Sequence, residues 1–150
     1  MNMKLEVVII PVSDVDRAKA FYEKLGWRMD GDFVISEKIR GIQFTPPRSE
    51  ASIIFGKGLT SAKPGSMTGL VLAVDNVEAA RAELIERGAE VSEVFHFADF
   101  PFNNSVPDAR IPGRDPENRT YFTFASFKDA DGNEWLLQEV TERLPGREWK

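Results

Sequence analysis

The sequence predicts an α+β fold made of two similar βαβββ units, and three features of the chain lead to this prediction. A stretch typical of a strand end, a turn and a helix, VSDVDRAKAFYEKLGW, begins at residue 12. A second copy, VDNVEAARAELIERGA, begins at residue 74, and this offset of 62 places Gly26 on Gly88. Each copy is followed by short segments of strand composition and not by another helix.

In the first copy, residues 5–12 are apolar and β-branched, which predicts a buried strand. Ser13 and Asp14 carry side-chain oxygens that can cap a helix beginning near Val15. Apolar positions then recur every three or four residues, and Gly26 supplies the left-handed residue that often ends a helix. Three further strands are predicted within residues 27–36, 39–46 and 50–58, because glycine, proline and polar turn residues separate them.

The second copy is longer than the first. Its helix is followed by a predicted strand within residues 89–96 and by a hairpin over residues 121–140 that turns at DADGN. Matching Ile54 with Leu136 needs an offset of 82 instead of 62, which predicts an insertion of roughly 20 residues between the strand and the hairpin. We therefore divide the chain into module one (4–57), a linker (58–67), module two (68–142, with an insertion at 97–119) and a C-terminal tail (143–150). Trp149 in this tail is either a dimer contact or a residue without a role.

Composition excludes several classes of function. The chain has no cysteine, which removes disulfides, thiolate nucleophiles and cysteine metal sites. Its net charge of −5, without a lysine- or arginine-rich run, argues against a nucleic-acid partner. No apolar run approaches the roughly 20 residues that a membrane-spanning helix needs, and no secretory signal is recognisable. We expect a cytoplasmic protein whose partner is a small molecule, with neither nucleic acid nor membrane involved.

The repeated helix motif and the closing DADGNEWLLQE resemble the vicinal oxygen chelate superfamily. This superfamily includes glyoxalase I, extradiol dioxygenases, fosfomycin-resistance transferases and bleomycin-resistance proteins. The resemblance covers roughly residues 5–142 and implies that the two βαβββ modules form a cup-shaped mixed sheet around a pocket. It also implies a homodimer.

The resemblance further indicates where relatives hold a divalent ion, with one side chain from the first and the last strand of each module. These positions fall on Val7, Ile54, Gly69 and Leu136. None of these residues offers an oxygen or nitrogen ligand, and the only histidine, His96, lies outside the four strands. We therefore predict a metal-free member of the superfamily with no cofactor.

Strand alternation predicts which side chains line the pocket, because residues two apart on a strand share a face. The predicted ligand-binding residues on the strands are Val7, Ile9, Gln43, Thr45, Ser52, Ile54, Gly69, Leu136 and Gln138, and Glu134 shares their face. They are mostly apolar, with a few amide and hydroxyl groups, which is typical of small-molecule sites.

The insertion has two interpretations. A long connection in a compact domain is often a functional lid, and Phe97, Phe100 and Phe102 are close enough together to stack on a planar ligand. Its three arginines, Arg110, Arg114 and Arg119, could meet a carboxylate or a phosphate. Alternatively, the phenylalanines fix the loop to the body of the protein or to a partner subunit, and the arginines form a solvated rim.

Three functions remain after this reasoning. The first is a metal-independent binding protein of the bleomycin-resistance type that sequesters an aromatic or amphipathic compound, with antibiotic or toxin resistance as a biological role. The second is a metal-free lyase or isomerase in which His96 or Glu134 transfers a proton. The third is an interaction module without a pocket.

Overall fold

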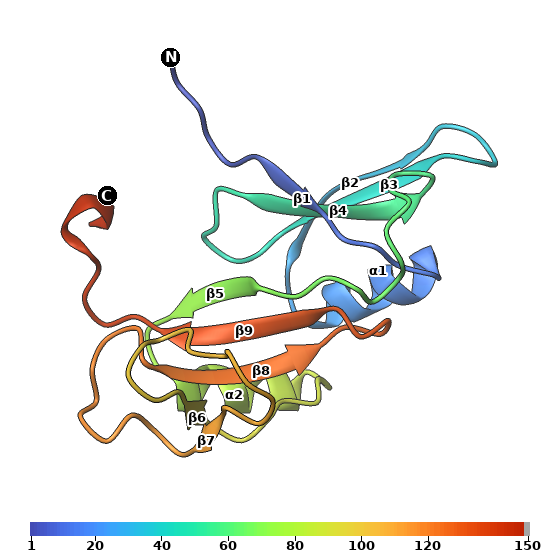
Figure 1. Ribbon diagram of the computed structural model, residues 1–150. Helices are drawn as coiled ribbons and strands as arrows, with labels where there is room; N and C mark the ends of the chain where they lie inside the picture. Colours follow the sequence, from blue (N-terminus) through green and yellow to red (C-terminus); the bar gives the residue numbers. More distant parts are fainter. Residues whose placement is uncertain (149–150) are drawn as a thin grey trace. The chain divides into compact units, whose positions relative to one another are not determined.

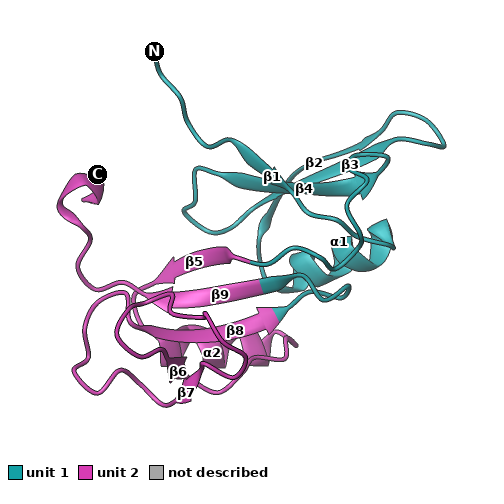
Figure 2. Cartoon of the chain, viewed as in Figure 1, with its two compact units in different colours: residues 1–68, 128–134 teal, residues 69–127, 135–150 magenta. Residues whose placement is uncertain are grey.

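The computed structural model describes residues 1–148 and consists of two compact units (Figure 1). Unit 1 comprises residues 1–68 and 128–134, and unit 2 comprises residues 69–127 and the chain from residue 135 onward (Figure 2). Each unit contains one mixed sheet with βαβββ connectivity, so the predicted α+β fold is confirmed. Within residues 1–148, no helix has the length and apolar character needed to cross a membrane. Trp149 lies outside the described residues.

Unit 1 contains β1 (Val7–Ile9), α1 (Val15–Lys24), β2 (Arg28–Val34), β3 (Arg40–Thr45) and β4 (Ser52–Lys57). The sheet order is β1-β4-β3-β2, with β1 parallel to β4 and the other pairs antiparallel. The helix begins where the sequence predicts, because the Asp14 side chain accepts a hydrogen bond of 3.0 Å from the Arg17 N–H. Ser13 does not take part in this cap, since its own N–H and hydroxyl both donate to Asp131.

The core of unit 1 lies between α1 and one face of the sheet, which we call the helix face. Tyr22 from α1 packs on Phe55, with ring centroids 5.5 Å apart, and Phe55 stacks on Phe44 at 5.8 Å. All three rings are buried. The residues between them on the strands point to the opposite face, which we call the free face. Phe55 therefore faces α1, and its neighbour Ile54 faces the opposite side of the sheet.

The hairpin turn at residues 128–134 belongs to unit 1 although it follows a strand of the second module. The Tyr22 hydroxyl donates to Asp129 at 2.9 Å, and Asn133 connects three separate backbone segments. Its amide nitrogen donates to the Pro11 carbonyl and to Asp129, while its amide oxygen accepts from the Met67 N–H. These bonds attach the turn to the start of α1 and to the linker.

Unit 2 repeats the arrangement with one additional strand. Its elements are β5 (Leu70–Val74), α2 (Val77–Glu86), β6 (Phe95–His96), β7 (Ile111–Pro112), β8 (Thr123–Lys128) and β9 (Glu134–Glu139), followed by a short 3-10 turn, η1 (Pro145–Arg147). The sheet order is β5-β9-β8-β6-β7. Asn76 caps α2 by accepting from the Ala79 N–H, and Gly88 ends it with a φ of 96°.

The strand pairing confirms the internal duplication. In unit 1, Ile9 is opposite Ile54 in the parallel pair of β1 and β4. In unit 2, Val71 is opposite Leu136 in the parallel pair of β5 and β9. These two partners differ by the same offsets, 62 and 82, that the sequence comparison predicts. The two units therefore share one pairing register.

Two predictions about the second module need correction. The strand expected within residues 89–96 is reduced to β6, because Ser92 hydrogen-bonds to Ser126 and Val91 forms only an isolated bridge. The insertion is also not structureless, since β7 pairs with β6 and extends the sheet by one strand. Backbone N–H and C=O groups of β7 thus find hydrogen-bond partners on β6 at the sheet edge. A strand of only two residues has no alternating pattern by which the sequence could predict it.

Candidate functional site

The free face of unit 1 carries six of the predicted ligand-binding residues. Val7 and Ile9 on β1, Gln43 and Thr45 on β3, and Ser52 and Ile54 on β4 share this face by strand register. Gln43 and Ile54 are directly opposite each other in the antiparallel pair of β3 and β4. Ile9 is half-exposed, whereas Thr45 and Ser52 are buried. The structure therefore groups these six side chains on one mostly apolar surface of unit 1.

Two hydroxyl groups form the polar end of this surface. The Thr45 and Ser52 hydroxyl oxygens are 2.7 Å apart, and the Thr45 hydroxyl also donates to the Asp30 carboxylate. Asp30 reaches Thr45 because a β-bulge between Met29 and Gly31 takes it out of the regular alternation of β2. The hydrogen bond from Thr45, with a second one from Arg28, lowers the pKa of Asp30 below its usual range. Asp30 is thus ionised at neutral pH.

The free face of unit 2 carries a cluster of aromatic rings. Phe95 and Phe124 are neighbours across β6 and β8 and stack with centroids 5.8 Å apart and an interplanar angle of 12°. Leu136 completes the floor on which Phe97 packs edge-on. We call the stacked pair Phe95 and Phe124 the aromatic platform. Gln138 lies on the same side of β9 as Leu136, and its amide donates to the Tyr121 carbonyl at 2.9 Å.

The insertion covers this platform, and its three phenylalanines have different roles. Phe97 is 3% exposed and belongs to the core cluster, whereas Phe100 is 63% exposed. Phe102 is 48% exposed, and its ring meets Phe124 edge-on at 5.6 Å. The sequence grouped these rings as equivalent stacking residues. In the structure, Phe97 is a buried anchor, Phe102 is a half-exposed cover of the platform, and Phe100 is an exposed ring.

The arginines of the insertion are engaged within unit 2. The Arg110 guanidinium lies 4.4 Å from the centre of the Phe95 ring and donates to the Ser126 hydroxyl. Arg119 forms two hydrogen bonds of 3.0 Å with the carboxylate of buried Asp115. Neither of the sequence-based interpretations, a solvated rim or ligand contacts, anticipated these internal bonds. The Arg110 contacts join the insertion to β8 and β6, whereas the Arg119 bonds cross-link residues 115 and 119 within the insertion.

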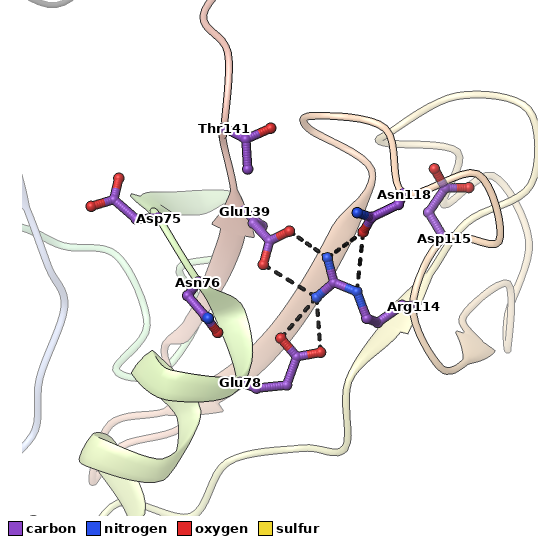
Figure 3. A pocket seen from close by; sticks show the side chains of 8 residues that line it. All are labelled: Asp75, Asn76, Glu78, Arg114, Asp115, Asn118, Glu139 and Thr141. Carbon is purple, nitrogen blue, oxygen red and sulfur yellow. Dashed lines mark hydrogen bonds and ion pairs between the residues drawn. The ribbon is translucent and has the colours of Figure 1, made fainter.

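The third arginine, Arg114, lies in a polar pocket of about 580 Å³ (Figure 3). Its guanidinium forms hydrogen bonds with both Glu78 oxygens at 2.8 Å, with Glu139 and with Asn118. The hydrogen bond from Arg114, with one from the Val77 N–H, lowers the pKa of Glu139. The Arg114 guanidinium is already paired with the carboxylates of Glu78 and Glu139. We therefore interpret these bonds as a structural connection between the insertion, α2 and β9, and not as a ligand site.

We expect the ion pair between Asp115 and Arg119 to make the free energy of unfolding depend on pH in the acidic range. The hydrogen bonds from Arg119 lower the pKa of Asp115 to about 2 from 3.8. A lowered carboxyl pKa contributes stability above the unfolded pKa, and this contribution is lost as the pH falls from about 4 to about 2. Asp115→Asn should therefore be less stable than the wild type by about 1 to 2 kcal/mol at pH 6. Urea unfolding at pH 6, 4 and 2.5 should show the difference shrinking, and a difference independent of pH would contradict this assignment.

The two residues considered for proton transfer lie on different strands, His96 on β6 and Glu134 on β9. The His96 ring bonds through Nδ1 to the Gly113 carbonyl at 2.8 Å, so this nitrogen carries the proton. On β6, His96 alternates with Phe95 and therefore points away from the aromatic platform. The group that orients the His96 ring through this bond is therefore the Gly113 carbonyl. Glu134 belongs to unit 1 and donates its backbone N–H to Met67.

The four positions at which relatives hold a metal do not fit a divalent ion. Val7 and Ile54 lie on the free face of unit 1, and Leu136 joins the aromatic cluster of unit 2. Gly69 has a φ of 80° and no side chain. Among residues 1–148, no group of three or more His, Asp or Glu side chains is arranged to hold a metal ion.

The structure is that of a duplicated βαβββ protein with a mostly apolar sheet face in unit 1 and an aromatic one in unit 2. Residues 4–137 match the model of the Glyoxalase/Bleomycin resistance protein/Dioxygenase superfamily, and the chain belongs to this superfamily. No curated protein matches the chain.

Three solved structures illustrate the kinship. The chain is similar to TnmS3, an antibiotic-binding protein from Streptomyces sp. CB03234, with 29% identity over 93% of this chain and 97% of that one and a TM-score of 0.65. A glyoxalase/bleomycin resistance protein from the same organism is 30% identical, covering 90% and 99% of the two chains, with a TM-score of 0.61. A superfamily member from Sphaerobacter thermophilus DSM 20745, at 24% identity over 92% and 98% and a TM-score of 0.67, shows the shared fold.

Several residues of the two free faces escaped the sequence analysis. Phe95 and Phe124 were not singled out, because aromatic residues on strands are common in any core. Asp30 was missed because regular alternation ignores bulges. The glycine of the Asp30-Gly31-Asp32 stretch was the available signal, since an isolated glycine inside a strand often marks a bulge.

Proposed function

We propose that this protein binds a planar aromatic or amphipathic small molecule without a metal ion and thereby sequesters it. The aromatic platform of unit 2, covered by the half-exposed Phe102, is the observation that carries this proposal. Stacked or edge-on ring contacts contribute about 0.5 to 1.5 kcal/mol each beyond the burial of their area. A flat ligand can gain this energy when it takes the place of Phe102.

The tip of the insertion, residues 98–109, is weakly attached, which supports the replacement of Phe102 by a ligand. The tip's own hydrogen bonds are local, such as those of Asn103 to Ala98 and to Phe100. Asp99 and Asp108 adopt left-handed backbone conformations with φ of 69° and 60°. The base of the insertion, residues 110–119, by contrast, is attached to β8 by Arg110 and to β9 by Arg114, and Arg119 cross-links it internally. Phe102 can therefore leave the platform without breaking the bonds that hold the base.

The absence of ligating side chains at Val7, Ile54, Gly69 and Leu136 supports binding without a metal. The similarity to an antibiotic-binding protein supports an antibiotic or another toxic compound as the ligand, with resistance as the biological role. A compound that is bound on the platform is no longer free in solution. Such a protein therefore lowers the free concentration of the compound in proportion to the amount of protein present. We also propose the homodimer that the family resemblance implies.

The enzymatic alternative has less support. His96 would have to act on a ligand from the face of β6 opposite to Phe95, and its Nδ1 is occupied by the Gly113 carbonyl. A general base must come within about 3 Å of the proton that it removes. A ligand on the aromatic platform does not meet this condition for His96.

A matched pair of substitutions on β8 tests the proposed site. Phe124 and Phe127 are both buried phenylalanines, but Phe124 is in the platform and Phe127 stacks on Trp135 on the opposite face. We expect Phe124→Leu to weaken the binding of 2-naphthol, acridine or anthraquinone at least tenfold by calorimetry. Phe127→Leu should change affinity less than twofold. Equal affinity losses in both variants, or no binding of any of these compounds to the wild type, would contradict the proposal.

A further inference from the structure

The buried hydroxyl pair on the free face of unit 1 has a fixed hydrogen-bond direction. Ionised Asp30 can only accept, so the single proton of the Thr45 hydroxyl is donated to it. The Thr45 oxygen, 2.7 Å from the Ser52 oxygen, must then accept the proton of Ser52. Both hydroxyl protons are used inside the chain of three side chains. The Ser52 oxygen retains only lone pairs.

The surroundings of Ser52 explain why this direction matters. Ser52 is 7% exposed and is opposite Val7 in the parallel pair of β1 and β4. Ile54 lies two residues further on the same face. Binding is favoured when a ligand donates a hydrogen bond to such an acceptor in an apolar setting. Binding is weakened when a ligand group that cannot donate displaces the water that had donated to it.

We propose that Ser52 Oγ is an acceptor-only subsite through which unit 1 selects ligands carrying an O–H or N–H donor on an apolar body. The Ser52 subsite belongs to unit 1 and is separate from the aromatic platform of unit 2. The inference rests on the proposed function for the aromatic character of the ligand, and it narrows the ligands of unit 1 to phenols, alcohols and amines. Ethers and ketones of the same shape present only acceptors and are discriminated against. Carboxylates meet the negative charge of Asp30 behind Thr45 and are also rejected.

The roles of the three residues differ. Ser52 touches the ligand, whereas Thr45 and Asp30 are positioning residues that act through Ser52. The lowered pKa of Asp30 agrees with an ionised group at the end of the chain. Without Thr45, the Ser52 hydroxyl can turn and donate, so the preference for donors is lost even though the Ser52 oxygen remains.

The test compares 2-naphthol with 2-methoxynaphthalene, which differ by replacement of the donor hydrogen with a methyl group. All proteins in this test carry Phe124→Leu, which weakens binding at the aromatic platform. In this background, calorimetry should give about tenfold tighter binding of 2-naphthol. Thr45→Val and Ser52→Ala should each reduce this ratio to less than threefold. Thr45→Ser, which restores the hydroxyl, should recover it, and Thr60→Val at an exposed position should leave it unchanged.

The possible failures are distinguishable. If the Phe124→Leu protein binds both compounds equally or binds neither, or if Thr45→Val and Ser52→Ala keep the tenfold ratio, the subsite is refuted, and the proposed function stands as long as the wild type binds one of the compounds. If the wild type binds neither compound, the proposed function and the subsite both fail. Thermal unfolding of each variant without ligand shows whether that variant folds. If Thr45→Val does not fold, the ratios measured for Ser52→Ala and Thr45→Ser decide whether the subsite exists.

Discussion

Asn133→Ala is expected to lower the free energy of unfolding by about 3 kcal/mol. Asn133 is 0% exposed, and its side chain makes bonds of 2.9 Å to the Pro11 carbonyl, 2.8 Å to Asp129 and 3.0 Å to the Met67 N–H. Alanine removes all three bonds and leaves the Met67 N–H without this acceptor. A buried donor that loses its acceptor costs about 1 to 3 kcal/mol, and the remaining bonds and the small cavity add to this cost.

The measurement is urea unfolding at neutral pH, followed by circular dichroism. For a chain of this length, a loss of about 3 kcal/mol lowers the melting temperature by roughly 10 °C. Asn104→Ala is the matched control, because Asn104 is exposed and its change should alter stability by less than about 0.5 kcal/mol. Equal stability of the two variants would show that the turn at 128–134 does not depend on Asn133.

Phe97→Ala is expected to have a similar cost, about 3 kcal/mol, with an additional local effect. Phe97 anchors the beginning of the insertion through edge-on contacts with Phe95 and Phe124, both at 5.6 Å. Removing its ring opens a cavity under the insertion and detaches the tip from the aromatic platform. Local unfolding of this segment should then need less free energy than unfolding of the sheet.

Limited proteolysis with chymotrypsin measures the local effect. Phe102 should become a cleavage site in Phe97→Ala while the sheet stays resistant; Phe100 is followed by Pro101, and chymotrypsin does not cleave before proline. Phe100→Ala serves as the control, because its exposed ring should contribute less than about 0.5 kcal/mol. A Phe97→Ala protein with unchanged stability and unchanged cleavage would contradict the role of Phe97 as an anchor.

Much of the fold could be predicted because local patterns specify it. The cap at Asp14 and the left-handed exit at Gly26 define α1 from a few neighbouring residues. The two offsets of the duplication carry Ile9 and its partner Ile54 onto Val71 and its partner Leu136, so the two units pair in equal register. Alternation then assigned residues to the free face of unit 1 correctly wherever the strands are regular.

The same reasoning failed at irregular places. The bulge at Asp30 changes the direction of one side chain and so creates the hydroxyl chain with Thr45 and Ser52. In the insertion, composition could not distinguish the anchor Phe97 from the exposed Phe100, since both are phenylalanines in a loop. Their difference depends on which of them reaches Phe95 and Phe124.

The sequence by itself determined the helix starts, the duplicated order of elements, the strand register and the apolar character of the positions where relatives hold a metal. Only the tertiary structure decided that the insertion covers the aromatic platform, that its arginines bind Glu139, Asp115 and Phe95, and that the turn at 128–134 joins unit 1. The physical reason is the range of the interactions. Caps, turns and alternation act between neighbouring residues, whereas these contacts join residues that are near each other only after the chain has folded.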